Sequence, residues 1–237
     1  MSSLQVLGTV LPGDIALKIN SDIQEVHLGP GLRLHDDVIQ ATRAGVLKVD
    51  SNKIYYVDSH QKRYIPQRRE FVIGIVMKKK GDNYLIDIGA NEMATISYLA
   101  FENASKKTRT EMKLGDLIYG QLIVANKDME PELVCIDLNY RSVGMGPLPS
   151  GGIYFTVPLQ VTRQIIDPDC PFLLRLSHYI NFTIVVGFNG RIWLKAAKNQ
   201  EMVALMHVIS MLEFMSVEEA DSNMSDLITS FLIQNIT

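Results

Sequence analysis

The feature that most constrains the fold is a single change of pattern near residue 144. The nine residues Gly144–Gly152 contain four glycines and two prolines, a composition typical of a connection between domains. Before this segment the chain carries only short runs with strand character, and after it helix and strand patterns alternate. We therefore expect a multidomain protein, mainly β and then α/β, with domains at 1–67, 68–143 and 144–237.

The first segment, 1–67, predicts a small β domain. A Pro-Gly pair inside Leu11–Asp14 suits a tight turn between two strand-like runs. Farther along, Gly45–Asp50 and Ile54–Asp58 flank three polar residues, an arrangement that predicts a β-hairpin. No apolar period of helix length occurs in this segment.

The middle segment, 68–143, predicts a closed barrel of the OB type. Five short apolar runs are separated by polar bends, and glycine near these bends lets a strand coil sharply. The first bend is predicted as a charged turn, Lys78–Asn83. The five expected strands are Phe71–Met77, Tyr84–Gly89, Ala94–Tyr98, Gly115–Val124 and Leu133–Asp137.

The last segment predicts the order strand, helix, helix, strand, strand, helix, which is the order of a KH-type domain. An additional helix is expected from Ser216, because Glu219 completes a capping-box pattern. The expected strands are Ile153–Val157, Phe182–Val186 and Arg191–Lys195, and the expected helices are Leu159–Ile166, Phe172–Tyr179 and an amphipathic one through Met202–Leu212.

KH domains grip a nucleic-acid backbone with a Gly-x-x-Gly loop between their first two helices. Here that junction is Asp167–Pro171, whose two acidic groups repel phosphate and whose two prolines lack amide donors. The Gly-x-x-Gly that is present, Gly187–Gly190, lies between two strands, where Asn189 followed by glycine favours a hairpin turn. We therefore interpret this domain as a packing module.

The charge balance excludes a polycation that holds nucleic acid by charge alone. Lysine and arginine total 23 and aspartate and glutamate 26, a net charge of −3. The segments 1–67 and 68–143 are each neutral, and the deficit lies in 144–237, with 5 basic and 8 acidic residues. With two cysteines, no signal-peptide pattern and no apolar run long enough for a membrane span, we expect a soluble protein of a reducing, intracellular compartment.

The sequence offers no catalytic motif. It lacks a phosphate-binding Gly-Lys-Ser/Thr loop, a His-Glu-x-x-His pair, paired cysteines at metal-ligand spacing and a Gly-x-Ser-x-Gly elbow. The five histidines are scattered, and adjacent carboxylates such as Asp36 and Asp37 are most simply solvated. We expect no enzyme activity, no metal and no cofactor.

The candidate binding residues lie in the predicted barrel. OB-type barrels bind single strands by stacking bases on aromatic rings and by placing basic side chains along the backbone. The alternative, that the basic clusters are solvated loops and the tyrosines are packing residues, stays open. The predicted RNA-binding residues are Lys78, Lys79, Lys80, Tyr84, Tyr98, Lys106, Lys107 and Arg109.

Several stretches give the chain a family resemblance. It resembles the cap subunit of the eukaryotic RNA exosome called ribosomal RNA-processing protein forty, or exosome component three. A Gly-x-Asn-Gly element and the run Asn126–Glu132 favour this subunit over its sibling cap proteins. The stretches that carry the resemblance are Tyr56–Tyr64, Val72–Val76, Gly115–Gln121, Val124–Asp137 and Gly187–Trp193.

The resemblance implies an N-terminal β domain that docks on a six-subunit ring, a central S1 domain and a C-terminal KH domain. In the family, three cap subunits stabilise the ring and guide RNA towards a 3′→5′ ribonuclease, and they carry no nuclease site. Gly187, Asn189 and Gly190 would form a structural turn between the S1 and KH domains. The implied partners are single-stranded RNA, ring subunits, neighbouring cap subunits and the ribonuclease, with no membrane.

The implied role is ribosomal RNA processing and turnover of messenger and non-coding RNA, in the nucleus and nucleolus and also in the cytoplasm. Two alternatives come from other classes of protein. The first is a ribonuclease in its own right, which normally needs clustered carboxylates for two metals. The second is an S1/KH binder that acts alone and therefore binds RNA tightly as an isolated chain, which the charge balance disfavours.

Overall fold

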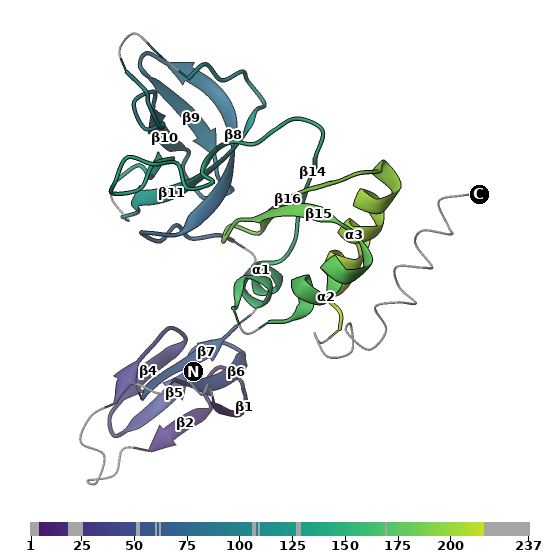
Figure 1. The fold of residues 1–237 in the computed structure, drawn as a ribbon. Coiled ribbons are helices and arrows are strands. Elements are labelled where there is room, and N and C mark those ends of the chain that lie inside the picture. The colour runs from purple at the N-terminus through teal and green to yellow at the C-terminus, as the bar shows by residue number, and fades with distance from the viewer. Residues whose placement is uncertain are drawn as a thin grey trace. The chain divides into compact units, whose positions relative to one another are not determined.

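The structure is a computed structural model. It forms two compact units, residues 1–61 and residues 62–237, and both are drawn in Figure 1. No helix among the described residues is long and apolar enough to cross a membrane. The described residues are 5–18, 26–50, 53–59, 61, 63–105, 108, 110–126, 129–168 and 170–215.

The first unit consists of two small β-sheets. The predicted β domain is confirmed, and its predicted hairpin is the antiparallel pair β6 and β7, with Val49 opposite Tyr55. The four-stranded sheet runs β1-β6-β7-β3, with strands Gln5–Val10, Gly45–Val49, Ile54–Asp58 and His27–Leu28. The three-stranded sheet runs β2-β5-β4, with strands Ile15–Lys18, Val38–Ala41 and Leu32–His35.

The core of the first unit is small. Val10, Ala41, Leu47 and Val57 form its buried cluster. Other apolar side chains stay in solvent, and each of the following is more than half exposed: Val6, Leu11, Ile15 and Leu34.

The second unit begins with the predicted barrel, which is confirmed. Strand β12 pairs with β10 on one side and with β11 on the other, so five strands close on themselves. Alternate side chains of each strand point inward, as strand geometry requires, and fill the barrel with aliphatic residues. The strands are β8 (Phe71–Lys80), β9 (Asn83–Asp87), β10 (Ala94–Ser97), β11 (Leu117–Val124) and β12 (Glu132–Val134).

Several details of this region differ from prediction. The fifth strand is Glu132–Val134, where Leu133–Asp137 was predicted. The lysine run belongs to β8 and not to a turn, since Lys78, Lys79 and Lys80 continue pairing with β9 beyond a register shift after Val76. The bend itself is only Gly81 and Asp82. In the predicted connection, Gly146–Pro147 forms β13 and adds an edge to β11. Proline is tolerated there because an edge strand leaves amide positions unpaired.

The rest of the second unit has the predicted KH-type order. A three-stranded sheet, β14-β16-β15, carries helices on one face (Figure 1), and Phe172, Leu176, Ile192, Leu194 and Leu205 are buried between them. The helix predicted from Ser216 lies outside the described residues. The elements are β14 (Ile153–Thr156), α1 (Leu159–Ile166), α2 (Phe172–Tyr179), β15 (Phe182–Val186), β16 (Arg191–Ala196) and α3 (Asn199–Met211).

Candidate RNA-binding surface and the contact that positions it

The predicted lysines lie on the surface at the end of β8. Lys78, Lys79 and Lys80 are all exposed to solvent. The Nζ atom of Lys79 lies 5.8 Å from the centroid of the Tyr84 ring, within the range of a cation–π contact. Three exposed cations on consecutive residues can neutralise phosphates on a strand of RNA that passes this end of the barrel. The other predicted basic residues, Lys106, Lys107 and Arg109, lie outside the described residues.

The two aromatic residues predicted to bind RNA, Tyr84 and Tyr98, are buried in the structure, which argues against base stacking by either ring. Tyr84 is 3% exposed and Tyr98 is 7% exposed. The Tyr84 hydroxyl donates to the carbonyl oxygen of Thr110 at 3.3 Å and accepts from the amide of Met112 at 3.4 Å. Both rings therefore contribute to packing of the barrel in this structure.

The Gly-x-Asn-Gly turn reaches out of the KH-type domain into the barrel. The side-chain amide of Asn189 donates to the carbonyl oxygens of Ile73 and Ile88, both at 2.8 Å. Its carbonyl oxygen accepts from the amide of Ile73 at 3.3 Å. Asn189 is 7% exposed, and the amide of Phe188 adds a bond to the carbonyl of Phe71 at 2.9 Å. One side chain therefore completes the backbone hydrogen bonding of two barrel segments.

The turn requires glycine at positions 187 and 190 because other backbone segments lie very close to it. A β-carbon on Gly187 would lie 2.8 Å from the amide nitrogen of Ile73, which is too close for a real contact. Gly190 has a φ of +78°, in the left-handed region, and a β-carbon there would lie 2.6 Å from the carbonyl oxygen of Val157. Only glycine satisfies both conditions at no steric cost.

A partly buried ion pair supports the same contact. Arg191 is 7% exposed, and its Nη2 lies 2.6 Å from Oδ2 of Asp87 on β9. Its Nη1 donates to the backbone carbonyl of the same aspartate and, at 3.4 Å, to that of Ile73. Because burying an unpaired charge is costly, this pairing makes the position of the barrel against β16 specific.

The pKa of the Asp87 carboxyl is lowered by this arrangement. Burial raises it, but the Gly89 amide, which donates to Oδ1 at 2.9 Å, and the Arg191 guanidinium together lower it more. The charged form of Asp87 is therefore the one that the folded protein stabilises.

The sequence between the first and second helices contains no Gly-x-x-Gly. Pro158 precedes α1 and Pro171 precedes α2, and neither helix has a side-chain cap. The Gly187–Gly190 turn sits between β15 and β16, closed by a bond from the Gly190 amide to the Gly187 carbonyl at 3.2 Å. The Gly187–Gly190 turn, whose sequence resembles a nucleic-acid-binding loop, thus packs against the barrel.

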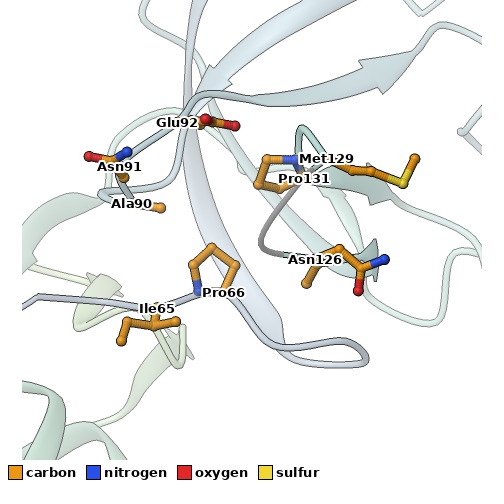
Figure 2. A pocket seen from close by; sticks show the side chains of 9 residues that line it. Ile65, Pro66, Ala90, Asn91, Glu92, Asn126, Met129 and Pro131 are labelled. Atoms are coloured by element: carbon orange, nitrogen blue, oxygen red, sulfur yellow. The ribbon is translucent and has the colours of Figure 1, made fainter.

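The barrel also carries a pocket that is lined by none of the predicted RNA-binding residues (Figure 2). Its volume is about 270 Å³, slightly below the range of about 300–1,000 Å³ that is usual for small-molecule sites. Its lining is mostly apolar, with Glu92 as the one ionisable side chain among the described lining residues. The lining residues are Ile65, Pro66, Ala90, Asn91, Glu92, Ala125, Asn126, Met129 and Pro131. Within the part of the chain that the structure describes, no group of three or more His, Cys, Asp or Glu residues could hold a metal ion.

Sequence reasoning missed the Arg191–Asp87 pair. A signal existed for each residue. Arg191 heads the apolar run Ile192–Leu194, and Asp87 is a charged residue between the apolar Ile86 and Ile88. A charge inside an apolar strand needs a partner, because its desolvation is otherwise uncompensated.

A barrel of the OB type joined to a KH-type domain through a buried turn defines the class of multidomain S1–KH proteins. A sequence-family model described as the S1 domain of exosome complex component RRP40 matches residues 64–146. A KH-domain model matches residues 152–200, and a model described as the Rrp40 N-terminal domain of an exosome complex exonuclease matches residues 26–63.

Individual relatives agree with these matches. The chain is 43% identical to exosome complex component RRP40 of Mus musculus, over 87% of this chain and 78% of the relative. It is 44% identical to the same component of Drosophila melanogaster, over 90% of this chain and 92% of the relative. The chain belongs to the exosome complex component RRP40 family.

A solved structure supports the fold alone. It is described as a candidate RNA-binding protein of the exosome complex, and it matches with a TM-score of 0.58 at 19% identity. The match covers 70% of this chain and 97% of the solved one.

The hydrogen bonds of Asn189 give a first prediction. Replacing Asn189 with alanine leaves the carbonyl of Ile88 and the amide of Ile73 buried without this partner, so we expect the free energy of unfolding to fall by about 1–3 kcal/mol. Asn189→Asp should lose at least as much, because a carboxylate cannot donate to either carbonyl. Trp193 is the only tryptophan and is 3% exposed, so its fluorescence reports the transition in a denaturant titration. The exposed Asn83→Ala is the matched control, and equal stability of the wild type and both Asn189 variants would contradict the account.

The lowered pKa of Asp87 gives a prediction for pH. A carboxyl whose pKa is lower in the folded state adds stability above its unfolded pKa, and that stability is lost as the pH falls through the folded value. We expect Asp87→Asn to be less stable than the wild type at pH 7, with the difference in stability narrowing as the pH falls below the usual carboxyl pKa of about 3.9. Asp116→Asn, which removes a carboxylate that accepts from the nearby Lys113 amide at 2.8 Å, is the control. A difference for Asp87→Asn that stays constant from neutral to acid pH would show that its charge does not matter.

Proposed function

We propose that this chain is a non-catalytic RNA-binding cap and scaffold subunit of the RNA exosome, which helps guide RNA to 3′→5′ processing and degradation. The observation that supports this most strongly is identity of 43% and 44% to relatives named as exosome components, over 78% and 92% of their lengths. The S1 and KH matches within one chain add RNA as the ligand of the assembly.

Each part of the chain has a task in this proposal. The first unit leaves Val6, Leu11 and Ile15 exposed, and burying such side chains against a ring subunit contributes binding energy. The barrel end with Lys78, Lys79 and Lys80 faces RNA. The KH-type domain contacts the barrel through Asn189 and Arg191, so these polar side chains serve packing between the two domains of this chain.

The proposal assigns no chemical step to this chain. Arg191 and Asp87, the two charged groups of the ion pair between β16 and β9, are used to join domains. The ribonuclease, the ring subunits and the neighbouring cap subunits are the proposed partners, and ribosomal RNA together with messenger and non-coding RNA is the proposed substrate of the assembly. The proposed location is the nucleus and nucleolus, with a further pool in the cytoplasm.

Native affinity purification tests the proposal. A tagged chain recovered at gentle salt from the cells that make it should bring down ring and cap subunits in near-equal amounts. Val6→Ser combined with Leu11→Ser should lower that recovery by tenfold or more, because each exposed apolar side chain buried in an interface contributes about 1.5–3 kcal/mol. Leu114→Ser, a substitution at a side chain of the second unit that is 70% exposed, is the matched control.

Recovery of the wild-type chain as a lone monomer would overturn the scaffold role. Degradation of labelled RNA by the purified chain with Mg²⁺ or Mn²⁺, abolished when a carboxylate of this chain is replaced, would overturn the non-catalytic role.

A further inference from the structure

Because Tyr84 and Tyr98 are buried, another aromatic side chain is needed if the barrel stacks RNA bases. Among the described aromatic side chains of residues 64–146, every one is buried or half-buried except Tyr140. Tyr140 is 77% exposed and lies in the loop that follows β12. An exposed ring on an OB-type barrel is the feature that single-strand binding uses.

The loop that carries Tyr140 is held in one conformation. The Asp137 carboxylate accepts from the amides of Asn139 at 2.8 Å and Arg141 at 2.9 Å. The Asp137 amide donates to the carbonyl of Arg141 at 2.8 Å, which closes the loop. The amide of Ser142 donates to the Glu102 carboxylate at 3.0 Å and fixes the loop to the barrel. The ring is thus presented by ordered backbone.

The backbone at Tyr140 is also strained. Its φ is +60°, in the left-handed region that tyrosine rarely adopts. Such a conformation costs of the order of 1–3 kcal/mol and persists only where neighbouring bonds impose it. The Asp137 bonds impose it here, and the result is a large ring that points into solvent.

Strand register places this loop at the end of the barrel that carries the lysines. Lys80 pairs with Asn83, and Asn83 pairs with Ser97, so the end of β8 and the end of β10 coincide. Strand β12 runs parallel to β10, with Glu132 opposite Thr95, and therefore ends there too. Directly after β12, the Cys135 amide donates to the Ala100 carbonyl at 2.9 Å, beyond the end of β10.

We propose that Tyr140 is a base-stacking platform for single-stranded RNA, working with the cations of Lys78, Lys79 and Lys80 at the same barrel end. The inference rests on the proposed RNA-binding function and names its aromatic residue. The ring stacks on a base while the lysines neutralise phosphates. The carboxylates of Asp137 and Glu102 are engaged by backbone amides, and stacking does not depend on their charge.

The combination of an exposed ring with nearby lysines favours RNA over a protein partner. The same loop, however, exposes the aliphatic side chains of Leu138, at 99%, and Val143, at 71%, which a protein partner would bury. A protein contact would use these aliphatic side chains at least as much as the ring. The two kinds of partner therefore differ in which substitution matters.

The test measures binding of the full chain to a fluorescent oligouridylate by anisotropy at several salt concentrations. Tyr140→Ala should weaken binding about five- to 150-fold with an unchanged salt slope, since stacking releases no counterions. Tyr140→Phe should bind like the wild type, because the ring remains. The triple variant Lys78→Ser, Lys79→Ser, Lys80→Ser should instead reduce the salt slope, by about 0.7 for each phosphate that the lysines no longer neutralise.

Controls separate the outcomes. Tyr179→Ala, at an aromatic side chain on α2 that is 55% exposed, should bind RNA like the wild type. Wild-type affinity in Tyr140→Ala would overturn the stacking proposal while leaving RNA binding intact, and so would an equal loss in Tyr140→Phe. Loss of subunit recovery in Leu138→Ser with unchanged RNA binding in Tyr140→Ala would assign the loop to a protein contact. No RNA binding by the wild-type chain at low salt would instead contradict the proposed function.

Discussion

The structure of the second unit depends on the Asn189 amide inserted between two barrel segments. Its two donors and one acceptor are matched to the carbonyls of Ile73 and Ile88 and to the amide of Ile73. Buried polar groups are costly unless paired, so this side chain fits one register of the KH-type domain against the barrel. Arg191 makes a second contact of this kind, an ion pair with Asp87 on β9. The two contacts explain why residues 62–237 form one compact unit.

This contact determines what remains for RNA. The Gly187–Gly190 turn is occupied by the barrel, and the junction at Asp167–Pro171 has acidic and proline residues where a phosphate grip needs amides. Strand register instead assigns the three exposed lysines of β8 and the loop that carries Tyr140 to the same end of the barrel. A neutral barrel segment with concentrated cations is suited to modest binding that an assembly reinforces.

Much of the fold could be predicted from local pattern. Helices α1 and α2 follow their predicted bounds because a proline precedes each one and an apolar face runs through each. The hairpin β6–β7 follows from turn chemistry. The lysine run was placed wrongly because Lys78–Lys80 has no apolar alternation to reveal a strand, and only pairing with β9 extends β8 through it.

The candidate site was harder to predict because residue type alone does not show exposure. The side chains of Tyr84, Ile86 and Ile88 share one strand face, and all three are buried, so period-two alternation indicated an inward tyrosine. Tyr98 follows Ala94 and Ile96 in the same way. Tyr140 could not be found from pattern, since its exposure depends on long-range bonds of Glu102 and on a left-handed backbone.

The central claim is that RNA meets this chain at the lysine end of the barrel and not at the KH-type junction. Photocrosslinking of 4-thiouridine RNA to the assembled complex, followed by mass spectrometry of the linked peptides, tests it most directly. The account predicts crosslinks within residues 78–84 and 137–143 and none within residues 167–171. Crosslinks on neighbouring subunits and on residues 167–171, with the barrel end unlabelled, would contradict it.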